Sequence, residues 1–360
     1  MFNYHADVST AADQPDWDLF LSNISGVYYV QTSWWGQLKA QRGAKAVRLV
    51  IKQKDKIVAG VQIIMKSISK TGIIVGYVPK GPVFMMNDPH LTSYLINQLH
   101  QLARAYHIQY LIVQPHENDN DFAQYLLHSG FSPSSTEISP TATIQVDLRQ
   151  KVEQLKAGMK KKSRCYLRRG LREGLTGRQG TVKDIPTFYR LLVATAERQG
   201  FTPFSKSYFT KSWALFKPRG HIALFLVEYN GEPVSGQVVV AFGDSVVALN
   251  SGWSGEHARL GPNYTMDWVT MKWAKSQGYH YYNLGGLQRK VASDLLQGKI
   301  KPDPNEIGAN YYKLNFGGQI ELASKAYGYV YNPVLRWGYT NIFHKIEKWP
   351  PIQMMLARFR

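Results

Sequence analysis

The residues best suited to chemistry lie in the stretch NYYKLNFGGQI, residues 310–320. One cation, Lys313, follows two tyrosines there and precedes Phe316 and the pair Gly317-Gly318. Taken alone, the stretch favours an ordinary strand whose lysine extends to solvent and which ends at a glycine turn. The chemical alternative is a lysine that aromatic neighbours withdraw from water, which strengthens its field on a nearby oxyanion. The glycines would then permit a close approach of a substrate where a side chain would obstruct it.

A second group of cations lies in residues 160–172, where seven of thirteen residues are Lys or Arg. Helical spacing places Leu155, Met159 and Tyr166 on one face. The other face carries four cations, which are Lys161, Arg164, Arg168 and Arg172. The pattern predicts one packed helix with a cationic stripe, which either contacts nucleic-acid phosphates or is an ordinary solvated surface.

The whole chain is basic, with 43 Lys and Arg against 25 Asp and Glu and a formal charge of +18 over 360 residues. This balance indicates a polyanionic partner, which could be RNA, a diphosphate or an acidic membrane surface. The single cysteine, Cys165, excludes an internal disulfide framework and fits a reducing compartment. Because no base is recognisable near it, we expect a structural or incidental thiol rather than a nucleophile.

The sequences at the two ends of the chain indicate where in the cell we expect the protein. The amino-terminal residues lack the basic and apolar regions of a secretory signal, and no stretch approaches the ~18 to 20 apolar residues of a membrane span. We therefore expect a soluble, cytoplasmic protein. Residues 336–360 combine aromatic and basic side chains in an amphipathic pattern. We expect them to pack back on a domain, and peripheral contact with the inner membrane face is the alternative.

Two segments of the chain share one plan of elements. Residues 49–64 and 225–240 each read as a strand, a polar turn and a second strand, at an offset of 176 that aligns Gly60 with Gly236. A helix-like stretch follows each, at 88–104 and 262–278, and another strand comes after it, at 108–114 and 279–286. The pattern predicts a tandem duplication of one mixed α/β unit.

Several common sites are absent from the sequence. The chain has no Gly-x-Gly and no GxxxxGK[ST], so neither a dinucleotide fingerprint nor a P-loop is available. It has no CxxC or HExxH, and its ten histidines show no ligand spacing. We expect neither a bound metal nor a cofactor.

The duplicated unit resembles acetyl-CoA-dependent N-acetyltransferases of the GNAT type. That family binds pyrophosphate through Arg/Gln-x-x-Gly-x-Gly/Ala, and this chain contains no Arg-x-x-Gly or Gln-x-x-Gly. If an acyl group is transferred, we expect a carrier other than CoA.

Seven segments, taken in order, resemble the FemABX family of aminoacyl-tRNA-dependent peptidoglycan bridge transferases. They are QTSWWGQLKAQ (31–41), YVPKGPVF (77–84), VDLRQ with the basic stretch after it (146–174), LLVATAERQGF (191–201), PNYTMDWVTMKWA (262–274), YYNLGG (281–286) and YYKLNFGGQ (311–319). Each segment is weak evidence alone, but together they span nearly the whole chain. A long heptad-patterned insert is absent, so the chain resembles the armless, FemX-like type.

The resemblance implies an α/β (α+β) fold of two tandem GNAT-like domains. We expect the first at 1–147 plus 325–360, with the carboxyl-terminal segment packing back on it, and the second at 148–324. It also implies a cleft for the diphosphate of a UDP-linked or lipid-linked muropeptide. The partners would be this precursor and aminoacyl-tRNA, with the stripe Lys161, Arg164, Arg168 and Arg172 binding the tRNA.

Individual positions carry expected roles from the same resemblance. Lys39 matches the lysine at the diphosphate site, Tyr208-Phe209 matches an aromatic pair, and Tyr312-Lys313 matches the Phe-Lys of the catalytic centre. Two positions depart from the family, since Phe204 replaces an arginine and Asn250 replaces a tyrosine. Other groups would then hold the muropeptide carrier, and Lys206 and Gly286 are the further substrate-binding residues that we expect.

The implied reaction is attack of a muropeptide amine on the ester of an aminoacyl-tRNA. Because the ester is already activated, positioning and charge stabilisation are the main tasks, and no covalent nucleophile is needed. Glu256 and Asp267 are candidates for the base, although either could simply cap or pair. Two alternatives stay open, namely acylation of another amine, from CoA for instance, and a noncatalytic RNA-binding relative.

Overall fold

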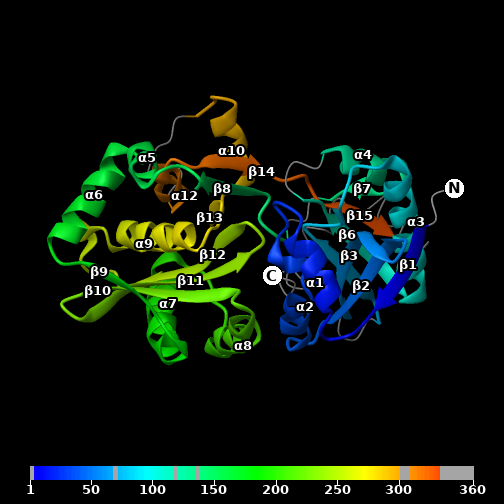
Figure 1. Ribbon diagram of the computed structural model, residues 1–360, viewed down its shortest axis with the longest axis horizontal. Helices are drawn as coiled ribbons and strands as arrows, with labels where there is room; N and C mark the ends of the chain where they lie inside the picture. The colour runs from blue at the N-terminus through cyan, green and yellow to red at the C-terminus, as the bar shows by residue number, and fades with distance from the viewer. Residues whose placement is uncertain (1–3, 68–71, 117–119, 135–137, 301–308, 333–360) are drawn as a thin grey trace. The chain divides into compact units, whose positions relative to one another are not determined.

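The computed structural model describes residues 4–67, 72–116, 120–134, 138–300 and 309–332. The chain divides into two compact units (Figure 1). Unit 1 comprises Met1–Thr141 and Leu322–Arg360, and unit 2 comprises Ala142–Glu321. Each unit contains one mixed sheet with helices packed on it, which confirms the predicted α/β class.

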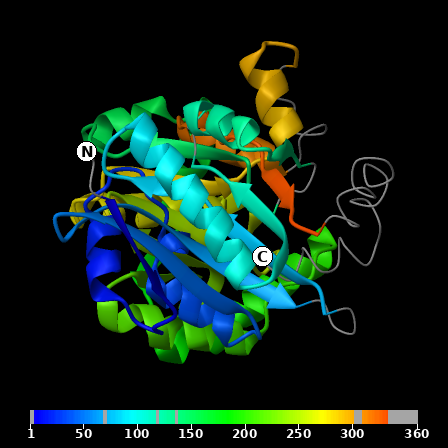
Figure 2. The ribbon, with the colours of Figure 1, turned by 90° about the vertical axis from the view of Figure 1, so that its right-hand side faces the viewer.

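Unit 1 is built on an eight-stranded sheet in the order β1-β2-β3-β4-β6-β15-β7, with β5 paired to β3. Its helix α3 lies across one face of this sheet (Figure 2). Its elements are β1 (Tyr4–Ser9), α1 (Pro15–Ser22), η1 (Tyr29–Gln31), α2 (Ser33–Ala40), β2 (Lys45–Gln53), β3 (Lys56–Ser67), β4 (Ile74–Pro79), β5 (Val83–Phe84), α3 (Pro89–Ala105), β6 (Ile108–Gln114), α4 (Asn120–His128), β7 (Ser132–Pro133) and β15 (Tyr327–Val330).

Unit 2 is built on a seven-stranded sheet in the order β14-β8-β13-β12-β11-β10-β9. Its elements are β8 (Ala142–Asp147), α5 (Val152–Gly158), α6 (Lys161–Arg172), β9 (Thr176–Gln179), η2 (Val182–Asp184), α7 (Ile185–Gln199), α8 (Lys206–Phe216), η3 (Lys217–Arg219), β10 (Ile222–Tyr229), β11 (Glu232–Phe242), β12 (Ser245–Trp253), η4 (Ala258–Leu260), α9 (Pro262–Ser276), β13 (Tyr281–Gly286), α10 (Arg289–Leu296), α12 (Ala309–Lys313), η5 (Leu314–Phe316) and β14 (Gln319–Leu322).

The two hairpins predicted from the sequence are structurally equivalent, which confirms the duplication. Val50 pairs with Gly60 in unit 1, and Leu226 pairs with Gly236 in unit 2, so the register agrees at the offset of 176. Each pair has its bulge at the matching position, after Ile51 and after Val227. The turns also match, because Lys54-Asp55 and Asn230-Gly231 all have positive φ, as type I′ hairpins require.

Gly60 and Gly236 are required at the matching positions for the same physical reason. A Cβ on Gly60 would lie 2.6 Å from the ring of Trp17 on α1, and a Cβ on Gly236 would lie 3.2 Å from the ring of Phe188 on α7. In each unit, therefore, an aromatic ring from the helix before the hairpin packs directly on the strand backbone. Gly236 faces α7, and because side chains alternate along a strand, the next residue, Gln237, faces α9.

The order and direction of the strands agree across both sheets. β4 and β6 are parallel in unit 1, as are β12 and β13 in unit 2. The next strand is antiparallel in each, β15 beside β6 and β8 beside β13. The expected domain boundary after residue 147 would assign β8 to unit 1. The structure differs there, because Tyr281 and Tyr282 of β13 pair with Asp147 and Val146 of β8.

Two local expectations were wrong. The basic stretch is not one helix, because α5 ends at Gly158 and α6 begins at Lys161. Met159 and Lys160 between them are extended, and the Lys160 N–H donates to the carbonyl oxygen of Asn315 at 3.0 Å. Lys313 does not lie on a strand either, since it ends the short helix α12.

Among the described residues, no helix combines the length and apolar character needed to cross a membrane. The amphipathic segment 336–360, which we expect to pack on a domain or contact a membrane surface, lies outside the described residues.

Candidate functional site

Lys313 is the last residue of α12 in unit 2. Its Nζ donates a hydrogen bond to the carbonyl oxygen of Gly286, at the end of β13. The residue is half-buried, and desolvation lowers the pKa of its ammonium group below the ordinary lysine value, an effect that an ionised Asp267 would oppose. Gly286, expected to bind substrate, is therefore the residue that orients the lysine through its backbone.

Tyr312, the residue before it, is fixed by both its hydroxyl group and its ring. The hydroxyl oxygen lies 2.5 Å from Asp267 Oδ2 and 2.6 Å from the carbonyl oxygen of Asn263, both on α9. The ring packs at 4.9 Å from Tyr264 and 5.1 Å from Phe316, measured between ring centres. Helix α12 is thus anchored to α9 at the residue next to the lysine.

Asp267 lies at the centre of a buried polar cluster with Gln237, Tyr282 and Tyr312. Its Oδ1 accepts a hydrogen bond from Gln237 Nε2 at 2.9 Å and from the Tyr282 hydroxyl at 2.6 Å. The side chain of Gln237 also donates to Ser251 Oγ at 3.0 Å. Asp267 is only 5% exposed, and burial raises the pKa of its carboxyl group.

Two members of this cluster were not predicted from the sequence. Gln237 interrupts the apolar run of β11, and Tyr282 lies in the middle of β13. A polar side chain inside a buried apolar strand was the available signal, because such a group needs a partner. The partner itself could not be predicted, since it depends on the position of α9 over the sheet.

Gly317 and Gly318, which follow Lys313, are required for a different reason from the one expected. Gly317 has φ +77°, and a Cβ there would lie 2.5 Å from the carbonyl oxygen of Gly158. A Cβ on Gly318 would lie 2.7 Å from Ile144 and 2.8 Å from the carbonyl oxygen of Gln145. The space beside these glycines is filled by α5 and β8 of the same unit, not left open for a substrate.

The cationic side chains of α6 differ in their contacts. Lys161, Arg168 and Arg172 are exposed, and Arg172 lies 3.4 Å from Glu173. Arg164 is half-buried and donates to the carbonyl oxygens of Ala157, at 2.8 Å, and of Met159. Arg164 therefore closes the end of α5, while the other three point their charge to solvent.

One aromatic contact joins α6 to the surroundings of Lys313. The rings of Tyr166 and Tyr264 are stacked with centres 5.0 Å apart and planes 3° from parallel. Tyr264 in turn contacts Tyr312 and Phe316. The cationic helix and the lysine are thus parts of one packed region of unit 2.

The expected aromatic pair lies at the start of α8. Tyr208 is 8% exposed and stacks on Phe204 with ring centres 4.4 Å apart. Phe209 is 1% exposed and packs against Phe188 of α7, so its side chain is a core residue that supports the helix. Lys206, the first residue of α8, is exposed.

Three other residues considered in the sequence make fewer contacts in the structure. Asn250 lies in β12, and its buried Oδ1 has no hydrogen-bond partner among the described residues. Glu256 is exposed in the turn after β12, and Cys165 is exposed on α6. Of the two carboxyl groups considered as a base, Asp267 is the one that contacts Tyr312.

In unit 1, Lys39 is a buried cation on α2. Its side chain is 4% exposed, and Nζ lies 4.6 Å above the ring of Trp35. Desolvation, with the nearby charges of Arg42 and Lys66, lowers its pKa to about 7. Thr32 caps the start of α2, because its hydroxyl accepts from the Trp35 N–H, and Gln62 of β3 donates to the Thr32 carbonyl oxygen at 2.8 Å.

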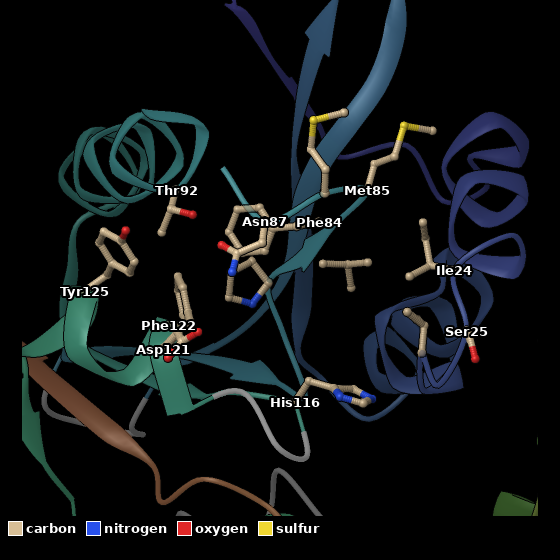
Figure 3. A pocket seen from close by; sticks show the side chains of 14 residues that line it. Ile24, Ser25, Phe84, Met85, Asn87, Thr92, His116, Asp121, Phe122 and Tyr125 are labelled. Atoms are coloured by element: carbon tan, nitrogen blue, oxygen red, sulfur yellow. The ribbon is translucent and has the colours of Figure 1, made fainter. Parts of the chain in front are cut away.

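Unit 1 also contains a pocket of about 410 Å³ beyond the carboxyl ends of β4 and β6. Figure 3 shows Phe122 and Tyr125 of α4 on one side and Ile24 and Met85 on the other. Polar groups at its edge are those of Ser25, Asn87, Thr92, His116 and Asp121. The size and the mixed lining suit part of a peptide or a similar small group.

Comparisons with known proteins cover both units. Residues 13–125 match the FemAB family, and residues 158–313 match an acetyltransferase (GNAT) domain. A lipid II:glycine glycyltransferase of Staphylococcus saprophyticus is 24% identical over 215 residues, which is 57% of this chain and 52% of the relative. The Staphylococcus aureus protein of the same name is 23% identical over 221 residues. The chain spans about half the length of these curated relatives, 52% in each case.

Solved structures share the fold. A crystal structure of FemX superposes with a TM-score of 0.80 at 19% identity, covering 91% of this chain and 98% of that one. A tandem GNAT protein from the clavulanic acid biosynthesis pathway superposes with a TM-score of 0.53 at 10% identity, covering 92% and 99%. Both likenesses support two GNAT-like domains in one chain.

Proposed function

The chain belongs to the FemABX family, and from this premise we propose that it transfers an amino acid from aminoacyl-tRNA to the stem-peptide amine of a peptidoglycan precursor. The observation that carries the proposal is the placement of Lys313. A partly desolvated cation ends α12, oriented by Gly286 and by the anchored Tyr312. The names of the staphylococcal relatives support the peptidoglycan precursor as the acceptor.

The chemistry needs a stabilised oxyanion and two positioned substrates. The neutral amine attacks the ester carbonyl, a C–N bond forms, and the C–O bond to the tRNA ribose breaks. The proton that the amine loses leaves with the ribose oxygen. The ammonium group of Lys313 stabilises the negative charge that develops on the carbonyl oxygen or on the departing ribose oxygen. The ring of Tyr312 forms a wall that positions the ester.

We assign the anionic end of the precursor to the cations of unit 1. The nearby charges of Arg42 and Lys66 add to desolvation in lowering the pKa of Lys39, so an anion beside Lys39 would be bound favourably. A diphosphate has the charge density for this role. Within unit 1, the pocket in Figure 3 offers room for part of the stem peptide. Tyr208 and Lys206 of α8, in unit 2, are residues that we separately propose to bind substrate.

We assign the tRNA to helix α6. Lys161, Arg168 and Arg172 hold their charges exposed on one helix, as phosphate contacts require. The stacked pair Tyr166 and Tyr264 connects this helix to the packing around Tyr312. Phosphate contacts of this kind would position the tRNA without reading its sequence.

The test is a transfer assay with purified protein and two donors. We expect a lipid-linked or UDP-linked muropeptide to gain the mass of one amino-acid residue when charged tRNA is supplied. Treatment of the tRNA with ribonuclease should abolish the gain, and acyl-CoA should not replace it. Transfer from acyl-CoA alone would instead support the N-acyltransferase alternative, and tRNA binding without any transfer would support a noncatalytic RNA-binding protein.

A further inference from the structure

The Tyr312 hydroxyl group makes two short contacts to oxygen atoms. If Asp267 is ionised, only one hydrogen is available for these two contacts. The Tyr312 hydroxyl oxygen has two short oxygen neighbours, Asp267 Oδ2 at 2.5 Å and the Asn263 carbonyl oxygen at 2.6 Å. A carbonyl oxygen and a carboxylate oxygen only accept hydrogen bonds, and a tyrosine hydroxyl donates one. Separations this short each require a hydrogen on the line between the two oxygens.

The other carboxyl oxygen of Asp267 already has its hydrogens. Gln237 Nε2 donates to Oδ1 at 2.9 Å. The Tyr282 hydroxyl oxygen lies 2.6 Å from Oδ1 and 2.9 Å from Gln237 Oε1, and we place its one hydrogen on the shorter contact, to Oδ1. The missing hydrogen therefore belongs on Oδ2. With it there, Oδ2–H donates to the Tyr312 oxygen, and Tyr312 O–H donates to the carbonyl oxygen of Asn263.

We propose that Asp267 is a neutral carboxylic acid in the folded protein and that, in this form, it positions Tyr312 and Lys313 for acyl transfer. The positioning role rests on the proposed function, whereas the protonation state does not. Asp267 would then act on the reaction through Tyr312 rather than as the base that accepts the proton of the amine.

The surroundings of Asp267 favour the neutral form. The side chain is 5% exposed, and burial raises its pKa because a carboxylate loses hydration there. The charged group that acts on it is Lys313, which would favour the carboxylate. The Lys313 ammonium nevertheless donates to the carbonyl oxygen of Gly286. Gln237, Tyr282 and Tyr312 are neutral, and their hydrogen bonds to the carboxyl group lower its pKa, but burial is the largest effect and the pKa is raised on balance.

A neutral acid also explains how Lys313 keeps a useful charge. A carboxylate near the ammonium would cancel much of its field at the oxyanion, since opposite charges at similar distances oppose each other. A carboxylic acid gives the same hydrogen-bonded anchor without that negative charge. The anchor and the field of the lysine are then both available to the reaction.

The first test measures the proton directly by infrared spectroscopy of protein labelled with ¹³C at the aspartate carboxyl carbon. At pH 7 we expect a carbonyl stretch of a protonated carboxylic acid that is present in the wild type and absent in Asp267→Asn. Tyr312→Phe should shift this band, because it removes the hydrogen-bond acceptor. Asp244→Asn, at a partly exposed aspartate of the same unit, should leave the band in place. A wild-type spectrum without the acid band would overturn the proposal.

The second test uses single-turnover kinetics with charged tRNA. Asp267→Ala should lower the rate by about 10²-fold, the cost of a misplaced catalytic group. Asp267→Asn should recover at least about tenfold of that loss, because an amide can donate to Tyr312 and accept at its oxygen as the acid does. An Asn variant as slow as the Ala variant would show that an ionised carboxylate is required and would overturn the positioning role.

Further controls distinguish three outcomes. A variant can fail to fold, the proposed function can be wrong, or the proposal about Asp267 can be wrong. If Asp267→Ala does not fold, Tyr312→Phe takes its place, with a similar expected loss and Tyr311→Phe as its matched control. If the wild type transfers no amino acid from charged tRNA, the proposed function fails. The infrared band then still decides whether Asp267 holds the proton.

Discussion

At the level of single residues, the proposed reaction depends on the position of the Lys313 ammonium group. Its ammonium group is half-buried, contacts one carbonyl oxygen and follows an anchored tyrosine. A lysine that only extended into solvent would keep its hydration and would not require an anchored tyrosine beside it. These surroundings suit the role that we propose for Lys313, the stabilisation of a developing negative charge.

Replacing Lys313 by Met keeps the stem of the side chain and deletes its charge. We expect kcat to fall by ~10²- to 10³-fold, or roughly 3 to 4 kcal/mol, as for loss of an oxyanion-hole donor. The measurement is the single-turnover rate with charged tRNA, with Lys299→Met as the control at an exposed lysine of the same unit. A folded Lys313→Met enzyme within about threefold of the wild-type rate would exclude this role.

Lys39 should make precursor binding depend on pH. Its pKa of about 7 means that the ammonium form is lost as the pH rises through neutrality. A bound diphosphate favours the charged form, so binding above pH 7 takes up a proton and the affinity falls as the pH rises. Calorimetric titration at pH 8, in two buffers with different ionisation enthalpies, measures this uptake.

Lys39→Met should abolish the proton uptake and weaken binding of the precursor without changing the affinity for tRNA. Lys56→Met, at an exposed lysine of unit 1, should change neither. Equal proton uptake by the wild type and Lys39→Met would remove Lys39 from the anion site.

At the scale of elements, the sequence was more informative about the hairpins than about the basic stretch. Apolar runs and polar turns are local signals, so both hairpins and the alignment of Gly60 with Gly236 could be predicted. The break at Met159 and Lys160 could not, because it depends on the hydrogen bond from Lys160 to Asn315, which is distant in the sequence. The Asp267 cluster was not predicted for the same reason, since α9, β11, β13 and α12 must first be assembled.

Helix α6 should bind tRNA through its exposed cations. The double variant Lys161→Glu/Arg168→Glu should raise KM for aminoacyl-tRNA and flatten the salt dependence of binding. The slope of the logarithm of the binding constant against the logarithm of the salt concentration should decrease in magnitude by about 0.7 to 0.9 for each phosphate group that the variant no longer binds. Arg164 is left intact because it closes α5.

The control for this double variant is Lys183→Glu on η2, which changes the charge of an exposed lysine elsewhere in unit 2. It should leave both KM and the salt dependence as in the wild type. Unchanged tRNA kinetics in the double variant would count against α6.

The packing of β12 on α7 should be intolerant of a single methyl group. A Cβ on Gly252 would lie 2.4 Å from the backbone nitrogen of Leu192 and 2.5 Å from the carbonyl carbon of Leu191. Because helix backbone must move to relieve this clash, we expect Gly252→Ala to lower the free energy of unfolding by about 1 to 3 kcal/mol. Denaturant unfolding measures this.

The matched control for Gly252→Ala is Gly158→Ala at the end of α5. No atom of the described residues lies within 4 Å of the Cβ position there, so this variant should be neutral or stabilising, by up to about 1 kcal/mol. Equal stabilities of the two variants would contradict the proposed packing of α7 on β12.

At the scale of the whole molecule, the two repeats have exchanged their last strands. β8 follows the first repeat in the chain but completes the sheet of unit 2, beside β13. β15 follows the second repeat but completes the sheet of unit 1, between β6 and β7. Sequence repetition alone would assign each strand to the repeat that precedes it, which is why the expected boundary after residue 147 differs from the structure.

Mass spectrometry of muropeptides from three strains tests directly whether transfer requires the protein and the charge of Lys313. One strain carries the wild-type gene, one lacks it, and one carries the Lys313→Met allele at equal protein abundance. We predict stem peptides with an added amino acid only in the wild-type strain, because transfer requires the protein and the charge of Lys313. Identical muropeptides in all three strains would contradict the proposed function.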